Sequence, residues 1–197
     1  MQTQTINTYA FNELSESAKS IAISVLNDIN TDYDWHNDDN DDFKSICSLL
    51  GIDVDNIYYS GFSSQGDGAC FEGAYTYKSG LLKAIKEYAP IDKELHRIAK
   101  QLQLVKYHGV SATIKHSGHY YHEYCTDIAV YQEDKDGYSD DDAPIELSDE
   151  ITELMRDLMR WLYKSLESQY EYLTSDEAII ETIEANDYQF TEDGELF

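Results

Sequence analysis

One stretch of the chain, Ser148 to Leu173, constrains the fold most strongly because it carries the longest helical pattern. Its apolar residues recur at spacings of three and four, which places them on one face of an α-helix. Ser148 is a favourable N-cap, and Asp149 and Glu150 lie in the first turn, where the helix dipole favours negative charge. A helix of about 26 residues is about 39 Å long, enough to cross a small domain. The expected buried stripe is Ile151, Leu154, Met155, Leu158, Leu162, Leu166, Tyr170 and Leu173.

The opposite face of this helix is acidic and is expected to face water, while the apolar stripe needs a partner to bury it. Two pairs of segments supply that partner, because each pair alternates apolar and polar side chains around a turn and so predicts a β-hairpin. The hairpins are expected at 52–77, around the turn 63–68, and at 110–131, around the two-residue turn Ser117-Gly118.

The other helical patterns are shorter and flank these hairpins, an order that does not match the alternation of a parallel sheet. The sequence therefore predicts an α+β fold, with an antiparallel sheet of four to five strands from two hairpins, helices packed on one side and a long C-terminal helix. We expect a single domain over residues 1–197, with an acidic flexible linker at 132–147. Further helices are expected at 15–30, 43–50, 79–89, 92–105 and 174–185, and a short strand at 188–191.

The charge of the chain is strongly negative and unevenly spread. The sequence holds 39 acids and 14 bases, a net charge of −25, whereas a small domain usually stays within a magnitude of about 2 to 8. Residues 1–60 have a net charge of −9, residues 61–110 of +2, residues 111–140 of −4 and residues 141–197 of −14. Because the acids gather at the two ends, we expect one or two acidic faces for a basic partner.

The cysteines and the hydropathy indicate the compartment. Cys47, Cys70 and Cys125 are an odd number at wide spacings in apolar surroundings, which indicates reduced thiols and neither a disulfide framework nor a zinc site. No signal peptide opens the chain and no run of 18 apolar residues occurs. We therefore expect a soluble protein of the cytoplasm.

The segment from Asp32 to Asp42 is rich in acids, and it admits three interpretations. It is a solvated loop that caps the next helix, or a recognition surface in which carboxylates supply charge and Tyr33, Trp35 and Phe43 act as anchors. A calcium loop is the third, but such loops need a glycine that this stretch lacks.

The hairpins carry the residues of an enzymatic alternative: Asp67, His116, His119 and His122. The glycine-rich turn at 63–68 lacks the lysine and the following helix of a phosphate-binding loop, so it is expected to be a hairpin turn. Strand alternation directs His119 and His122 to opposite faces, which argues against a metal site. A general acid–base role in a small hydrolase remains open.

Three segments of the chain are similar to a family of acidic proteins of tailed bacteriophages, sometimes described as antitoxin-like. They are 60–73 (SGFSSQGDGACFEG), 116–123 (HSGHYYHE) and 172–178 (YLTSDEA) with 190–194 (FTEDG). The resemblance covers the chain from about residue 40 to its end. It implies a phage origin and a bacterial host cytoplasm, and it carries over no catalytic residues.

These observations favour a non-enzymatic phage inhibitor of a host defence nuclease or other nucleic-acid-binding machine, an anti-CRISPR or anti-restriction protein that mimics DNA. The expected partner is a basic host protein, without direct nucleic-acid or membrane binding, and a homodimer is compatible with the sequence. An antitoxin-like or adaptor protein that wraps a basic partner is the alternative binding function. No cofactor or metal is expected. The candidate partner-binding residues are Asp34, Trp35, Asp38, Asp39, Asp41, Asp42, Asp140, Asp141, Asp142, Glu153, Asp157, Glu167 and Glu171.

Overall fold

The structure, a computed structural model, describes residues 7–105, 109–133 and 141–197, without the side chains of 141 and 142. Within it the chain forms two compact units, where the sequence led us to expect one domain. Unit 1 combines Met1–His36 with Ser168–Phe197, and unit 2 is Asn37–Glu167. The long helix α5, Ile145–Leu173, contributes residues to both units.

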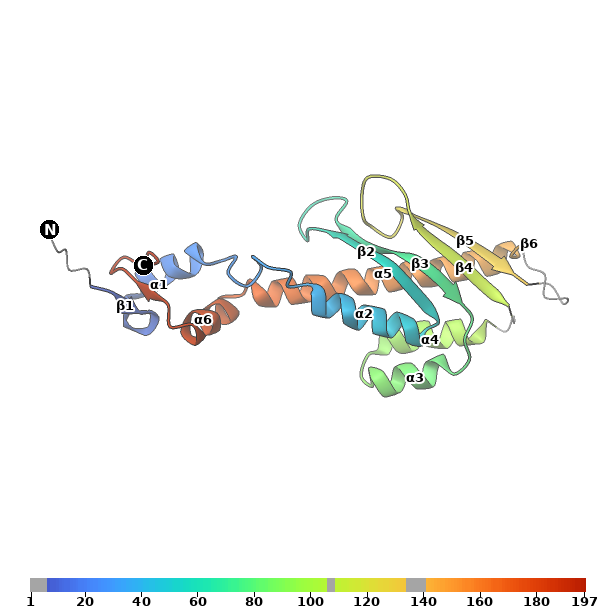
Figure 1. The fold of residues 1–197 in the computed structure, drawn as a ribbon, viewed down its shortest axis with the longest axis horizontal. Coiled ribbons are helices and arrows are strands. Elements are labelled where there is room, and N and C mark those ends of the chain that lie inside the picture. Colours follow the sequence, from blue (N-terminus) through green and yellow to red (C-terminus); the bar gives the residue numbers. More distant parts are fainter. Residues whose placement is uncertain (1–6, 106–108, 134–140) are drawn as a thin grey trace. The chain divides into compact units, whose positions relative to one another are not determined.

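Unit 2 is built on an antiparallel sheet with the strand order β2-β3-β4-β5-β6. The first hairpin pairs Ile52 with Tyr75, and the second pairs Ile114 with Ile128 (Figure 1). The two hairpins join through β3 and β4, where Tyr75 lies opposite Ala112. The strands are β2 (Ile52–Ser60), β3 (Gly68–Thr76), β4 (Val110–His116), β5 (Thr126–Gln132) and the short β6 (Asp141–Asp142).

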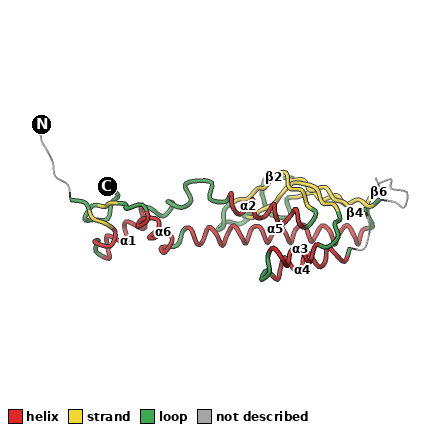
Figure 2. Tube along the Cα trace, turned by 60° about the horizontal axis from the view of Figure 1, so that its bottom comes forward, coloured by secondary structure: helices red, strands yellow, loops and turns green. Residues whose placement is uncertain are grey.

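The helices of unit 2 lie on one side of this sheet, as Figure 2 shows for α3, α4 and α5. They are α2 (Asn37–Leu49), α3 (Leu81–Tyr88), α4 (Lys93–Leu104) and α5. The predicted stripe of α5 from Ile151 to Leu166 is buried, together with Met159, whereas Tyr170 and Leu173 are half-buried in unit 1. Phe43 of α2 packs edge-on against Phe71 of β3, with 5.5 Å between ring centres. The predicted α+β class, sheet and long C-terminal helix are confirmed.

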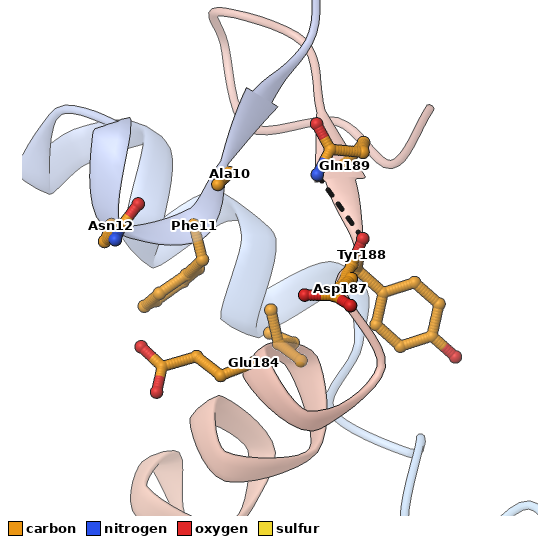
Figure 3. A pocket seen from close by; sticks show the side chains of 8 residues that line it. Ala10, Phe11, Asn12, Glu184, Asp187, Tyr188 and Gln189 are labelled. Atoms are coloured by element: carbon orange, nitrogen blue, oxygen red, sulfur yellow. Dashed lines mark hydrogen bonds between the residues drawn. The ribbon is translucent and has the colours of Figure 1, made fainter.

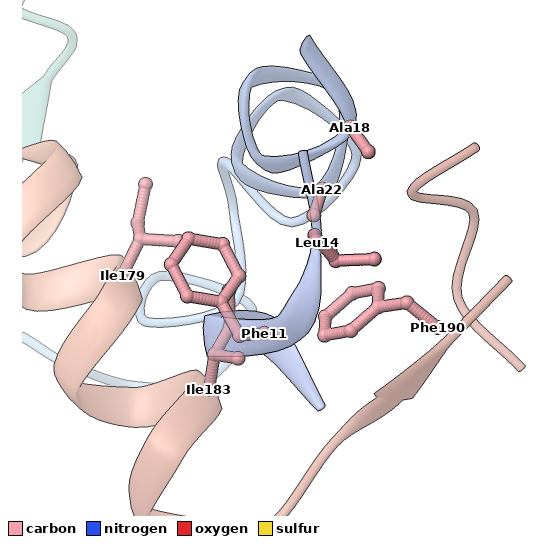
Figure 4. Packing of buried hydrophobic residues seen from close by; sticks show 7 residues of the cluster. All are labelled: Phe11, Leu14, Ala18, Ala22, Ile179, Ile183 and Phe190. Atoms are coloured by element: carbon pink, nitrogen blue, oxygen red, sulfur yellow. The ribbon is translucent and has the colours of Figure 1, made fainter. Parts of the chain in front are cut away.

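Unit 1 joins the two ends of the described chain. The strand β1 (Tyr9–Ala10) pairs with β7 (Gln189–Phe190), and the short 3-10 helix η1 (Phe11–Glu13) follows β1 (Figure 3). The helices α1 (Glu16–Val25) and α6 (Asp176–Ala185) complete the unit. Figure 4 shows its core, in which apolar side chains from both ends of the chain meet: Phe11, Leu14, Ala18, Ala22, Ile179, Ile183 and Phe190.

Several predicted helix ends are wrong by a turn or more, because the local caps differ from the expected ones. The helix α5 begins at Ile145, so Ser148 lies inside it and is no N-cap. The helix α1 ends at Val25 and not near residue 30. At the start of α6 the hydroxyl of Ser175 accepts from the Ala178 amide at 3.3 Å, so the helix begins at Asp176 and not at the predicted residue 174.

The second hairpin does not turn at Ser117-Gly118. Its connection comprises residues 117–125, because β4 ends at His116 and β5 starts at Thr126, which lies opposite it. His119 and His122 therefore lie in a loop, and strand alternation does not apply to them. The expected linker at 132–147 is also shorter, because Gln132 is in β5, Asp141–Asp142 form β6 and α5 starts at Ile145.

Candidate functional site

Unit 1 carries an extreme excess of acids. Its 66 residues contain fourteen acidic side chains and a single basic one, Lys19, a net charge of −13. All fourteen acids are exposed, so the excess lies at the surface of the unit. They are Glu13, Glu16, Asp28, Asp32, Asp34, Glu171, Asp176, Glu177, Glu181, Glu184, Asp187, Glu192, Asp193 and Glu195.

Little within unit 1 compensates this charge. The Lys19 ammonium lies 2.9 Å from the Glu16 carboxylate, one turn earlier in α1, and so forms an ion pair with it. The Glu13 carboxylate accepts from the Ala10 amide at 2.8 Å, and that of Glu181 accepts from the Tyr172 hydroxyl at 3.5 Å. Unit 2, by comparison, has 25 acids and 13 bases. The surface of unit 1 is therefore the strongest candidate for binding a positively charged partner.

Large apolar side chains accompany these acids on unit 1. Tyr33 is 62% exposed and Phe197 is 67% exposed. Ile21 and Val25, four residues apart on α1, are also exposed, as is Tyr172 near the end of α5. Aromatic and apolar anchors within a charged surface are typical of protein interfaces.

Three of the predicted partner-binding residues belong to unit 1. Asp34 and Glu171 are exposed, as expected for partner-binding carboxylates. Trp35 is half-buried, and its ring lies 5.9 Å from that of Tyr170 and 5.7 Å from that of His36. Its ring therefore packs within unit 1, which differs from the exposed anchor that the sequence suggested.

The acids that we expected in a loop before α2 lie within that helix, which begins at Asn37. Asp38 and Asp41 are exposed, and Asp38 and Asp39 occupy the first turn, where the helix dipole stabilises them. Asp39 is half-buried and accepts from the Ser165 hydroxyl at 3.2 Å. Asp42 accepts from the Tyr88 hydroxyl at 2.6 Å. Two of the four carboxylates thus tie α2 to neighbouring helices.

Two predicted partner-binding acids of α5 are paired with arginines of the same unit: Glu153 is exposed, as expected, whereas Asp157 is half-buried. The Asp157 carboxylate accepts from Arg97 of α4 and, at 2.5 Å, from Arg160. The Glu153 carboxylate lies 2.6 Å from Arg156 and 3.6 Å from Arg160. Arg156 and Arg160 lie on α5 itself, each three residues after the acid that it contacts most closely, and Arg97 reaches Asp157 from α4.

This network of ion pairs changes the pKa of Asp157. Burial alone would raise the pKa of its carboxyl, but the hydrogen bonds and charges of Arg160 and Arg97 outweigh burial and lower that pKa. The pKa of Arg97 is raised, first by its hydrogen bonds to Glu94 and then by Asp157. The ion pair of Arg97 with Asp157 links α4 to α5, and the arginines offset the charges of Asp157 and Glu153.

Of the four remaining predicted partner-binding residues, the structure describes the side chain of Glu167 but not those of Asp140, Asp141 and Asp142. Glu167 is half-buried on α5. Asp140 lies outside the described residues, and for Asp141 and Asp142 only the backbone, paired with β5, is described.

Of the hairpin residues of the enzymatic alternative, Asp67 and His122 line one pocket, whereas His116 and His119 are not among the residues that line it. The Asp67 carboxylate accepts from the amides of Ser63 and Ser64, at 3.0 and 2.6 Å, and so closes its own turn. His119 is exposed in the loop 117–125. The Nε2 atom of His116 lies 2.9 Å from the Tyr120 carbonyl oxygen.

His122 lies beside Cys125, with 3.4 Å between Nε2 and Sγ, a pair that the sequence analysis did not foresee. The Nδ1 atom of His122 accepts from the Tyr124 amide at 3.2 Å, so the ring proton belongs on Nε2, facing the sulfur. A base that activates a thiol must present an unprotonated nitrogen to it. This arrangement does not favour a Cys–His nucleophile.

Glu72 on β3 is a further residue that the sequence analysis did not select. Its carboxylate accepts from Asn56 at 3.1 Å, from the Tyr58 hydroxyl at 2.9 Å and from the His116 amide at 3.1 Å. These hydrogen bonds, with Asn56 first, lower the pKa of Glu72, and the bond to Glu72 raises the pKa of Tyr58. Glu72 therefore links β2, β3 and the end of β4, which is a structural role.

Neither a metal site nor a membrane span emerges from the described part of the chain. Across residues 7–105, 109–133 and 141–197, no group of three His, Cys, Asp or Glu side chains is arranged to hold a metal ion. Among the same residues, no helix has the length and apolar character needed to cross a membrane.

The comparisons with curated proteins and with solved structures found no match. Residues 35–176 match a family model described as a domain of unknown function, DUF8835. The matched segment contains all of unit 2 and leaves most of the acid-rich unit 1 outside. Because the match covers more than half of the chain, the protein belongs to the DUF8835 family.

Proposed function

We propose that this protein is a non-enzymatic inhibitor that binds the basic nucleic-acid channel of another protein through the carboxylates of unit 1. The observation that carries the proposal is that all fourteen acids of unit 1 are exposed while its one cation is already paired. A basic channel built for phosphates would be attracted to such a surface, since duplex DNA carries about one charge per 1.7 Å of axis. The partner class follows from this complementarity, and the resemblance to phage proteins suggests a bacterial host protein.

A folded surface favours mimicry over wrapping. Phe11 and Leu14 near the start of the chain pack with Ile183 and Phe190 near its end, so both acidic segments of unit 1 are fixed to one core. A protein that wraps its partner would leave such segments unfolded until binding. Ordered carboxylates lose less conformational entropy on binding than a flexible acidic tail.

The hydrolase alternative has weaker support. Asp67 is occupied by its own turn, and the proton on His122 faces the thiol that it would have to activate. Direct nucleic-acid binding is disfavoured because the net charge of −25 repels phosphate.

The proposal is tested by affinity capture from a bacterial lysate with matched charge variants. One bait replaces four acids of unit 1 by their amides, at Glu171, Glu177, Glu192 and Glu195. The control replaces four exposed acids of unit 2, at Asp53, Asp55, Asp127 and Asp149. Both variants lose four negative charges. A difference in the amount of captured protein therefore shows that the location of the acids matters, and not the total charge.

We expect the wild-type bait and the control to capture a nucleic-acid-binding protein at about 50 mM salt and to lose most of it at about 200 mM. The unit 1 variant should capture markedly less at the lower salt concentration. Capture of no nucleic-acid-binding protein, or equal capture by the two variants, would contradict the proposal.

A further inference from the structure

A pocket of about 270 Å³ opens on unit 1 between η1, the end of α6 and β7 (Figure 3). The side chains of Phe11 and Ile183 lie at its floor, where only a small part of their apolar surface is open, 7% of Phe11 and 1% of Ile183. Its rim is polar and acidic, with Glu184 and Asp187 beside Asn12 and Gln189. In the view of Figure 3 the Glu184 carboxylate lies beside the Phe11 ring, and the Asp187 carboxylate lies farther from that ring.

The two carboxylates are available to a ligand. Within residues 7–105, 109–133 and 141–197, neither has a hydrogen-bond or ion-pair partner, and both residues are exposed. Asp187 has a left-handed backbone with φ of 52°. It lies directly after Asn186, the C-cap residue of α6. The Gln189 amide donates to the Asp187 carbonyl oxygen at 3.4 Å, a bond that leaves the Asp187 carboxylate unused.

An apolar floor with an acidic rim has the chemistry to bind a long cationic side chain. The methylene groups of such a side chain bury against the floor while its charged end reaches the rim. An arginine matches best, because its planar guanidinium stacks on an aromatic ring and donates several hydrogen bonds in the same plane. Glu184 and Asp187, which both line the pocket, offer the carboxylates that would accept those hydrogen bonds.

We infer that this pocket binds an arginine side chain of the basic partner and is the anchor point of the acid-rich surface. The inference rests on the proposed function and makes it specific, because it names the group that the partner inserts. The volume is below the range of about 300 to 1,000 Å³ that is usual for sites of small molecules and cofactors. It suits one side chain.

The test is a titration of the full chain with N-acetyl-arginine amide, followed by NMR chemical shifts. We expect shifts of the backbone amides of Phe11, Glu184, Asp187 and Gln189, with a dissociation constant on the order of 1 mM. N-acetyl-norleucine amide, which lacks the cation, should bind at least about fivefold more weakly. Stronger binding of N-acetyl-lysine amide than of the arginine probe would overturn the choice of arginine.

Matched variants separate the pocket from general charge. The double variant Glu184→Gln with Asp187→Asn removes both carboxylates, and asparagine tolerates the left-handed backbone at 187. The control, Glu177→Gln with Glu181→Gln, removes the same charge from α6 without touching the pocket lining. We expect the pocket variant to weaken the arginine probe at least about fivefold more than the control does.

Equal weakening by the two double variants, or shifts spread over unit 1 without a maximum at the pocket, would overturn the inference. The proposed function would survive that result if the protein still captured a nucleic-acid-binding partner in a salt-sensitive manner. It would fail separately, with the pocket intact, if the arginine probe bound as expected and no such partner was captured.

Discussion

The guanidinium of Arg97 on α4 donates to the carboxylate of Asp157 on α5, two residues 60 positions apart in the sequence. Arg160 binds the other oxygen of the same carboxylate at 2.5 Å. Asp157, an acid on the polar face of α5, is thus bound by arginines of its own unit. Acids of unit 1 have no comparable arginine, because Lys19 is the only basic side chain of that unit.

Replacing Asp157 by asparagine should destabilise unit 2 by about 1 to 2 kcal/mol. The change removes the negative charge and one of the two oxygens that accept from Arg97 and Arg160, which costs less than at a fully buried site because the Asp157 side chain is 20% exposed. Denaturant unfolding of the full chain measures the loss. The control Asp53→Asn, at an exposed position of β2, should change the free energy of unfolding by less than about 0.5 kcal/mol.

The same contact predicts acid sensitivity. The folded-state pKa of Asp157 is lowered, so its stabilising contribution is complete above the unfolded value of about 3.9 and is lost as the pH falls through the folded value. We expect the melting temperature to fall below about pH 4, with a shallower fall in Asp157→Asn. Identical pH profiles for the two proteins would show that the Asp157 carboxyl titrates alike in the folded and unfolded chain.

Asn30 is a buried polar residue that links distant segments of unit 1. Its amide nitrogen donates to the Leu173 carbonyl oxygen at 3.0 Å, and its oxygen accepts from the Thr182 hydroxyl at 2.7 Å. Asn30→Ala leaves both partners without this bond and should destabilise unit 1 by about 1 to 3 kcal/mol. Hydrogen exchange should show faster exchange in α6 than in the wild type, with little change in β3 and β4.

The control for this prediction is Asn27→Ala, an exposed asparagine three residues earlier. Its exchange rates should match those of the wild type. Equal protection of α6 in both variants would mean that the Asn30 hydrogen bonds contribute nothing to unit 1.

The three free cysteines should differ in reactivity. Burial raises the pKa of Cys47, and burial, followed by the charges of Cys125 and Glu72, raises the pKa of Cys70 to about 12. Cys125 is half-buried in the loop 117–125. One thiol per chain should therefore react with an aromatic disulfide reagent in the native protein, and three after denaturation. Cys125→Ser should abolish the native reaction, and rapid native labelling of more than one thiol would contradict the burial of the others.

Sequence periodicity was sufficient for the fold class and for the core of α5, because the stripe from Ile151 to Leu166 depends only on helical spacing. The sequence prediction was wrong where the end of a helix or a turn was placed from one local motif. Ser148 resembles an N-cap, but the helix continues to Ile145. Ser117-Gly118 resembles a tight turn, yet the loop extends to Cys125 and lies against β3, where a Cβ on Gly68 would come within 2.5 Å of the His122 Cα.

The candidate site was harder to predict, since charge counts do not show which acids are paired within the fold. Asp157 and Glu171 both lie on the polar side of the same helical pattern, but only Asp157 meets arginines. The acids of α6 and the C-terminal turn were counted in the charge of the C-terminal third but not chosen as partner-binding residues. The structure places both ends of the described chain in unit 1. The acids of α6 and of the C-terminal turn therefore lie in the same unit as Asp28 and Asp32, which the sequence does not show.

The most direct test of the central claim is a competition between this protein and duplex DNA for the captured partner. If the carboxylates of unit 1 occupy a nucleic-acid channel, the protein should displace a labelled duplex at stoichiometric concentration. The variant with amides at Glu171, Glu177, Glu192 and Glu195 should require at least about tenfold more protein. A stable ternary complex in which partner, duplex and this protein bind together would contradict the account.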